Sequence, residues 1–130
     1  MINGIVLTHS DLGKAFVNTA FRIVGPANRI DSLSSAGLSP KDLKVRLEKI
    51  VERDDNDDKT IVFVGLKGGN PWHVACRVAK ERPNISVISG LNLPMLLSFL
   101  TKRDELPLSG LLEILKIDAL RGIDIFPGDA

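Results

Sequence analysis

The chain has 130 residues, of which 44% are hydrophobic, and its 17 Lys and Arg nearly balance its 16 Asp and Glu. This length suits one domain with its own core, and the composition excludes a disordered or fibrous protein. With a net charge of +1 and no basic stripe interleaved with aromatic residues, neither nucleic acid nor an anionic membrane surface is expected as a partner.

The first predicted elements are a strand and a helix. Residues 2–7 form a short and almost continuous apolar run, which is typical of a strand buried on both faces. Gly25 and Pro26 end the helix that follows. Its pattern consists of residues that recur with helical spacing: Leu12, Ala15, Phe16, Thr19, Ala20, Ile23 and Val24.

A weaker strand over residues 29–33 and a second helix come next. Ser39 is expected to be the N-cap of this helix and Pro40 its first residue. Its inward-facing residues are predicted to be Leu43, Leu47, Ile50 and Val51. The polar run 52–59 indicates a solvent-exposed helix end and loop, to which we assign no function.

The second half of the chain continues the alternation of strand and helix. Residues 60–66 predict a strand, and the turn at 67–71 leads into a helix whose inward residues are Val74, Ala75, Val78 and Ala79. Residues 85–88 predict a fourth strand, followed after a turn by a helix that begins at 94–100 with Met95, Leu96, Phe99 and Leu100 inward. A last helix is expected over residues 109–121.

Strands that are apolar on both faces and alternate with helices predict a small doubly wound α/β domain, in which helices cover both faces of a parallel sheet. We assign residues 1–123 to this domain and 124–130 to a C-terminal tail. Cys76 is the single cysteine, which excludes an internal disulfide and indicates a reducing compartment. Because neither a signal peptide nor a membrane-length apolar run is recognised, a cytoplasmic location is expected.

His9 is the first candidate for chemistry. Ligands of open parallel sheets bind at the carboxyl ends of the strands, so the turns after the first, third and fourth strands should converge on one edge. The start of the first helix disfavours an imidazolium, and we therefore expect a neutral imidazole whose free ring nitrogen can act as a nucleophile.

The turn before the third helix is the second candidate. Gly68 and Gly69 let the backbone approach a ligand closely, and a helix start at Asn70-Pro71 presents N–H groups to an anion. Together with His9, this suggests capture of a phosphoryl group on histidine, without a metal or cofactor. A hydrogen-bonding surface histidine beside a simple turn is the alternative.

Other chemistries find little support. No Gly-Lys-Ser/Thr follows the glycines and no GxGxxG occurs, which disfavours nucleotide binding. Ser10 beside His9 lacks the G-x-S-x-G elbow of a hydrolase. His73 could share a metal with His9, but an exposed helix residue is the simpler interpretation. Cys76 is expected to be a small core residue.

Three motifs taken together resemble a known family. Thr8-His9 follows the first strand, Gly68-Gly69-Asn70-Pro71 follows the third, and ISGLNLPML at residues 88–96 follows the fourth. In this order they resemble the mannose-type enzyme IIA domain of the bacterial phosphoenolpyruvate:sugar phosphotransferase system, over residues 2–123. The motif at 88–96 is the most specific of the three.

The resemblance implies that His9 takes a phosphoryl group from the phosphohistidine of the histidine phosphocarrier protein and passes it to a IIB component, which phosphorylates a sugar. It also implies an intracellular homodimer. Trp72 or Leu91 would provide a hydrophobic rim for partner docking. The residues that bind or support the phosphate are then Thr8, Ser10, Gly68, Gly69 and Asn70.

The sequence also departs from the family pattern. Gly65 stands where typical members have an aspartate that orients the histidine, so Asp11, a backbone carbonyl or water would have to replace it. Asn70 replaces a serine, an exchange between two helix-capping residues, and Ser10-Asp11 replaces a glycine. The missing aspartate predicts slow transfer or a regulatory domain that reports carbon status to another protein. A small-molecule-binding domain that shares only the fold is the third alternative.

Overall fold

The computed structural model describes residues 1–53 and 58–128. A four-stranded parallel sheet has the order β2-β1-β3-β4, with the strands β1 (Asn3–Thr8), β2 (Ile30–Ser34), β3 (Thr60–Val64) and β4 (Ile85–Ser89). The helices are α1 (Leu12–Val24), α2 (Pro40–Arg53), α3 (Asn70–Glu81), α4 (Leu93–Lys102) and α5 (Leu108–Arg121). The predicted doubly wound α/β architecture is confirmed, and the division at residue 123 stays a prediction.

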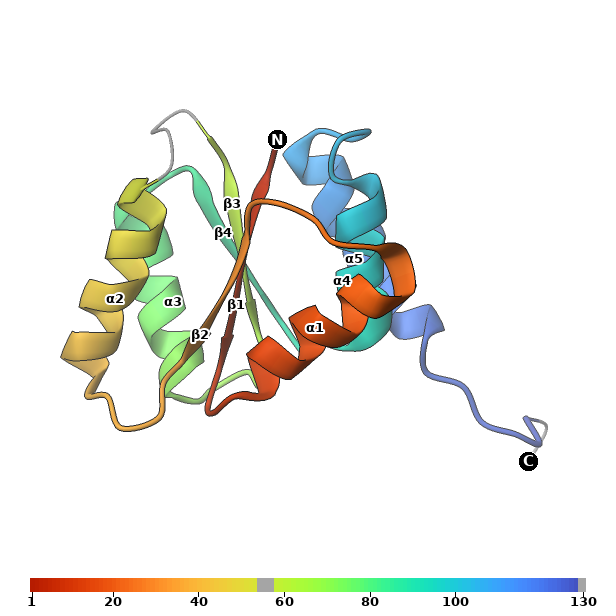
Figure 1. The fold of residues 1–130 in the computed structure, drawn as a ribbon, viewed down its shortest axis with the longest axis horizontal. Coiled ribbons are helices and arrows are strands. Elements are labelled where there is room, and N and C mark those ends of the chain that lie inside the picture. Colours follow the sequence, from red (N-terminus) through yellow and green to blue (C-terminus); the bar gives the residue numbers. More distant parts are fainter. Residues whose placement is uncertain (54–57, 129–130) are drawn as a thin grey trace.

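The helices form two layers, with α1, α4 and α5 on one face of the sheet and α2 and α3 on the other (Figure 1). Successive residues of β1 point to opposite faces. Val6 packs with α1, α4 and α5, whereas Ile5 and Leu7 pack with α2 and α3. Burial on both faces explains why this strand is an unbroken apolar run in the sequence.

The strand order places the topological switch of the sheet between β1 and β3. From β1 the chain crosses to β2 on one side, and from β3 it crosses to β4 on the other. The helices that follow these two central strands, α1 and α3, lie on opposite faces (Figure 1). Open α/β sheets bind ligands beyond the carboxyl ends of the strands at such a point. His9 follows β1 and the Gly68-Gly69 turn follows β3, so both candidates flank it.

Local signals set several element boundaries as predicted. Gly25 ends α1 with φ 93° and donates its N–H to the Phe21 carbonyl. At the start of α2, Ser39 Oγ accepts a hydrogen bond of 3.1 Å from the Asp42 N–H. The third strand, however, ends at Val64 instead of residue 66.

The buried side of α1 differs from the sequence pattern. Its buried residues are Gly13, Val17 and Ala20, whereas Leu12 is 53% exposed and Ile23 is 56% exposed. Gly13 lies so close to β1 that a Cβ would stand 3.0 Å from Val6 Cγ1. Because this contact depends on a residue without a side chain, the apolar pattern could not predict it.

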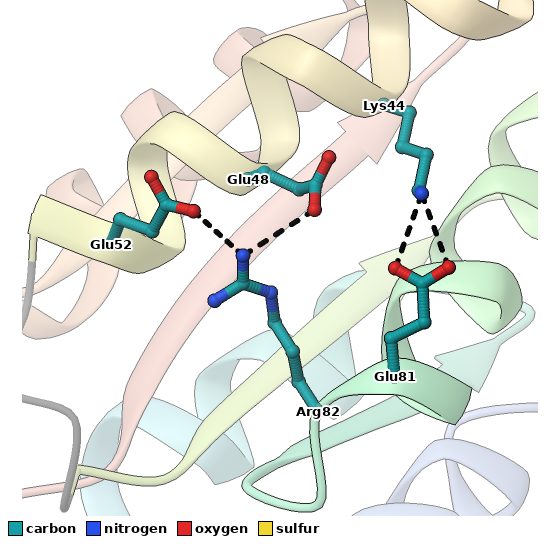
Figure 2. Close-up of polar contacts among 5 residues, drawn as sticks. All are labelled: Lys44, Glu48, Glu52, Glu81 and Arg82. Carbon is teal, nitrogen blue, oxygen red and sulfur yellow. Dashed lines mark hydrogen bonds and ion pairs between the residues drawn. The ribbon is translucent and has the colours of Figure 1, made fainter.

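Charged side chains join α2 and α3 across their outer surface (Figure 2). Arg82 Nη2 lies 2.6 Å from Glu52 Oε1 and 3.3 Å from Glu48 Oε2, while Lys44 Nζ lies 3.1 Å from Glu81 Oε2. Such solvent-accessible pairs each contribute about 1 kcal/mol or less. Of the polar run 52–59, the first two residues belong to α2 and residues 54–57 lie outside the described residues.

Candidate functional site

His9 leaves the end of β1 and lies against the turn that precedes α3. Its side chain is exposed, and a Cβ built on Gly69 would stand 2.9 Å from His9 Nε2 and 3.0 Å from its Cε1. The imidazole can approach this closely only because residue 69 has no side chain. The fold therefore brings together the two candidates that the sequence places on separate turns.

The turn that faces His9 contains the start of α3. Gly68 has φ 96°, in the left-handed region that favours glycine, and Gly69 is the extended N-cap of the helix. The first N–H groups of a helix have no partner within it, and the helix dipole makes this end partly positive. Since Pro71 has no N–H, Asn70 and Trp72 carry the first two helical donors. This arrangement suits a phosphate-sized anion.

Asn70 does not cap α3. It is the first helical residue, and no side chain makes a capping hydrogen bond to this helix start. The expectation that Asn70 serves as a capping residue is therefore wrong, because the extended residue before the helix is Gly69. As a result, no capping side chain competes with a ligand for the N–H groups at this helix start.

Thr8 and Ser10 belong to the loop that carries His9. The Thr8 hydroxyl donates to the Ser10 carbonyl at 2.7 Å and accepts from the Gly13 N–H at 2.9 Å. Ser10 lines a small cavity of about 190 Å³ together with Lys14 and Ser34. Thr8 is 2% exposed, so it supports the loop from beneath, whereas Ser10 lies on the surface.

Two positions bear on how the His9 ring is oriented: Gly65, where the orienting aspartate is missing, and Asp11, its possible replacement. A Cβ on Gly65 would have Thr8 Cγ2 as its nearest neighbour, at 3.8 Å, so the backbone has room for a side chain there. Asp11 is exposed and its side chain makes no capping hydrogen bond to α1. Among the described residues, no hydrogen bond joins Asp11 to the His9 ring.

The predicted hydrophobic rim is only partly present. Leu91 is 8% exposed, because the turn at Gly90 directs it into the core and its N–H donates to the Val64 carbonyl at 3.2 Å. Its assignment to a docking surface is therefore wrong. Trp72 is half-buried and lines a cavity of about 510 Å³. Leu66, in the turn after β3, is 62% exposed.

Neither remaining candidate adds a second site. His73 lies exposed on α3, and across residues 1–53 and 58–128 no group of three or more His, Cys, Asp or Glu could hold a metal. Cys76 was expected in the core but is only half-buried. This burial raises the pKa of its thiol above the ordinary value. No helix in the described part of the chain is long and apolar enough to cross a membrane.

The most specific motif, residues 88–96, serves the fold. Asn92 Oδ1 accepts the Met95 N–H at 2.9 Å and so caps α4, while its Nδ2 donates to the Ala119 carbonyl of α5 at 2.9 Å. Sequence reasoning missed this link and also missed Gly13. For Gly13, the available signal was a glycine at the start of a predicted helix, five residues after the threonine that follows the first apolar run.

Comparisons with known proteins agree with this arrangement. The family model described as "PTS system fructose IIA component" matches residues 4–116. Over 106 residues the chain is 30% identical to the sorbose-specific EIIA component of Klebsiella pneumoniae. The aligned part covers 82% of this chain and 78% of that protein. The chain is also 26% identical over 117 residues to the fructose-specific EIIA component of Bacillus subtilis, strain 168. That alignment covers 89% of this chain and 80% of the Bacillus protein.

A solved structure supports the same relationship. The crystal structure of the phosphotransferase system component EIIA from Streptococcus agalactiae superposes with a TM-score of 0.90, at 27% identity and with 98% of each chain covered. Both the sequence match and the architecture thus extend over nearly the whole domain. The chain therefore belongs to the mannose-type IIA components of the sugar phosphotransferase system, a family with a phosphotransfer role in that system.

Proposed function

We propose that the protein is a cytoplasmic phosphoryl carrier whose His9 accepts a phosphoryl group from the histidine phosphocarrier protein and passes it to a IIB component. One observation carries the proposal: the exposed imidazole lies with its Nε2 edge against Gly69, at the partly positive start of α3. Family membership supports the reaction class. The identity of donor, acceptor and nucleophile belongs to the proposal.

The proposed step transfers a phosphoryl group between two imidazoles. The lone pair on Nε2 of neutral His9 attacks the phosphorus, and an N–P bond forms as the N–P bond of the donor breaks. The electron pair of the broken bond returns to the donor ring, and each ring keeps the proton on its other nitrogen. Transfer to the IIB component repeats this exchange with His9 as the donor.

The phosphoryl group is expected to be held by Gly68, Gly69 and Asn70. Backbone N–H groups at a helix start need no rearrangement to donate to phosphate oxygens, so they stabilise the charge that develops during transfer. Glycine at position 69 leaves the space beside the His9 ring free of a side chain, and glycine at position 68 adopts the left-handed backbone of the turn. Thr8 and Ser10 contribute by shaping the loop of His9.

We also propose that two copies form a homodimer. The segment after α5 extends away from the body of the molecule (Figure 1), and its Ile125 and Phe126 are 73% and 99% exposed. The edge strand β4 contributes Val87 and Ile88 to the apolar cavity of about 510 Å³. Exposed apolar surfaces of this kind favour burial between subunits.

A second candidate function rests on Gly65. No carboxylate at this position can orient the His9 ring, so transfer to sugar would be slow and the phosphorylation state itself could be the signal. The protein would then act as a regulatory IIA domain that binds a regulatory protein. Labelling of His9 without onward transfer to any cognate IIB component would favour this function.

The proposal is tested by intact mass measurement after mixing the protein with phosphoenolpyruvate, enzyme I and the histidine phosphocarrier protein. We expect an acid-labile gain of one phosphoryl group in the wild type and in the His73→Ala control, and no gain in His9→Ala. A gain that persists in His9→Ala would refute the nucleophile. No gain in the wild type, with a carrier proven active on another IIA protein, would refute the carrier function.

A further inference from the structure

Thr8 ties together both ends of the loop that carries His9. It is the last residue of β1, and its carbonyl accepts the Ser35 N–H at 2.9 Å, which fixes its backbone beside the end of β2. Its hydroxyl donates to the Ser10 carbonyl at 2.7 Å and accepts the Gly13 N–H at 2.9 Å. His9 therefore lies in a short loop closed by one buried oxygen atom.

The start of α1 depends on this hydroxyl. Asp11 occupies the N-cap position with φ −74° and ψ 6°, and its side chain makes no capping hydrogen bond. The Gly13 N–H, one of the first-turn donors that lack a helical partner, is bound by Thr8 instead. Thr8, which belongs to the preceding strand, therefore supplies the capping hydrogen bond that an N-cap side chain normally makes.

Gly13 makes this contact possible. A Cβ at residue 13 would stand 3.1 Å from Thr8 Oγ1 and 3.2 Å from the Val6 carbonyl oxygen. Both distances are shorter than most Cβ contacts, so a side chain at residue 13 would push the helix start and the strand apart by a few tenths of an ångström. The close approach leaves few conformations to the loop between the two residues.

The Thr8 hydroxyl has no donor left for a phosphate. A threonine hydroxyl carries a single proton, and here that proton is given to Ser10. The side chain is also nearly completely buried. Of the two roles that the sequence allowed, support of the site fits this geometry.

We propose that Thr8 is a positioning residue for phosphotransfer: its two hydroxyl hydrogen bonds set the loop that aims the His9 imidazole at Gly69. The inference rests on the proposed function for its kinetic effect, but not for its structural effect. Loss of both bonds with retention of shape should let the loop change conformation and move the imidazole away from the start of α3. Since transfer requires close alignment of the reacting atoms, the rate should fall by about tenfold or more.

The test compares Thr8→Val, which keeps the shape and removes both hydrogen bonds, with Thr8→Ser, which keeps the hydroxyl. Ser98→Ala is the control, because it removes another buried hydroxyl bond, of 2.6 Å to Asp118, that joins α4 to α5. Initial phosphorylation rates are measured together with the NOE between His9 Hε1 and the Gly69 Hα protons. We expect both to be lost or weakened in Thr8→Val and preserved in Thr8→Ser and Ser98→Ala.

Equal rates and equal NOEs in Thr8→Val and the wild type would overturn the inference, and so would equal losses in Thr8→Val and Thr8→Ser. If Thr8→Val does not fold, Thr8→Cys replaces it, because a thiol is a weak hydrogen-bond partner and should lower the NOE and the rate relative to Thr8→Ser. If the wild type takes no phosphoryl group, the carrier function is refuted. The NOEs of the same variants then still test whether Thr8 positions the His9 ring.

Discussion

Two loops at the carboxyl edge of the sheet look equally important in the sequence but do different work. The loop after β1 leaves His9 exposed against Gly69, with no side chain between the ring and the start of α3. The loop after β4 turns inward: Leu91 is buried, and Asn92 caps α4 while it holds α5. The first loop presents the exposed His9 ring at the surface, and the second uses the polar groups of Asn92 within the fold.

The difference fits the proposal that phosphotransfer takes place at the loop after β1 and not at the most recognisable motif. Within residues 88–96, Asn92 joins two elements of the fold at once, because its side-chain amide can both accept and donate a hydrogen bond. The proposed reactive site needs only a histidine and a glycine that leaves space for its ring. A motif of that kind is short and common. It indicates a site only when the fold places the histidine beside the glycine turn.

After His9→Ala, which should abolish labelling, the largest change is expected in Gly69→Ala, which disturbs the contact between the His9 ring and the start of α3. A methyl group would overlap His9 Nε2 at 2.9 Å and displace the exposed ring, while the extended backbone at residue 69 accepts alanine. A misplacement of about 1 Å lowers a transfer rate by roughly a hundredfold. We therefore expect that loss in the initial phosphorylation rate, together with a loss of about 1 kcal/mol or less in unfolding free energy, because alanine is a poorer N-cap residue than glycine. A wild-type rate would show that the imidazole does not react from this position.

Asn92→Ala should instead destabilise the fold at the loop after β4. The α4 cap and the bond to the Ala119 carbonyl are both lost, which costs about 2 kcal/mol of unfolding free energy. Urea unfolding measures this loss, and Asn70→Ala, which removes an asparagine that caps nothing, is the stability control. The folded Asn92→Ala protein should phosphorylate at the wild-type rate. Equal stability of the two variants would contradict the structural role of Asn92.

Gly65→Asp sharpens the comparison by adding a group to the reactive edge. The nearest atom to a Cβ there is Thr8 Cγ2, 3.8 Å away, so the backbone can carry a side chain at this position without a clash at Cβ. If the added carboxylate accepts a hydrogen bond from the His9 ring, a rate increase of about tenfold is expected from better orientation and stabilisation of the ring. Stopped-flow phosphorylation checks this, with Gly65→Asn as the uncharged control. A rate that falls in Gly65→Asp but not in Gly65→Asn would mean that charge repulsion outweighs orientation.

Much of the fold could be predicted because each strand carries its own evidence. β1 and β3 are apolar on both faces, which indicates a covered parallel sheet, and Gly25 and Ser39 mark helix boundaries through local backbone and hydrogen-bond requirements. The candidate nucleophile and the glycine turn also followed from their positions after strands. These inferences depend on neighbouring residues only.

The remainder depends on contacts between distant segments. The sequence predicts that the turns after the first and third strands lie at one edge of the sheet. The direct contact of His9 with Gly69 also requires β1 to pair with β3, and the sequence does not specify strand order. The buried side of α1 is decided by the close approach of Gly13 to β1, which leaves no apolar signature. Leu91 was misplaced because a leucine in a turn looks the same whether it faces solvent or, as here, the core.

The most direct measurement of the central claim is an NMR spectrum of the phosphorylated protein with ¹⁵N-labelled histidine and backbone. The account predicts that the phosphoryl group is on Nε2 of His9. It also predicts the largest amide shifts at Gly68, Gly69 and Asn70, with the Asn92 loop nearly unchanged. Phosphorylation of another residue, or amide shifts concentrated at the Asn92 loop, would contradict the division between a reactive loop and a structural one.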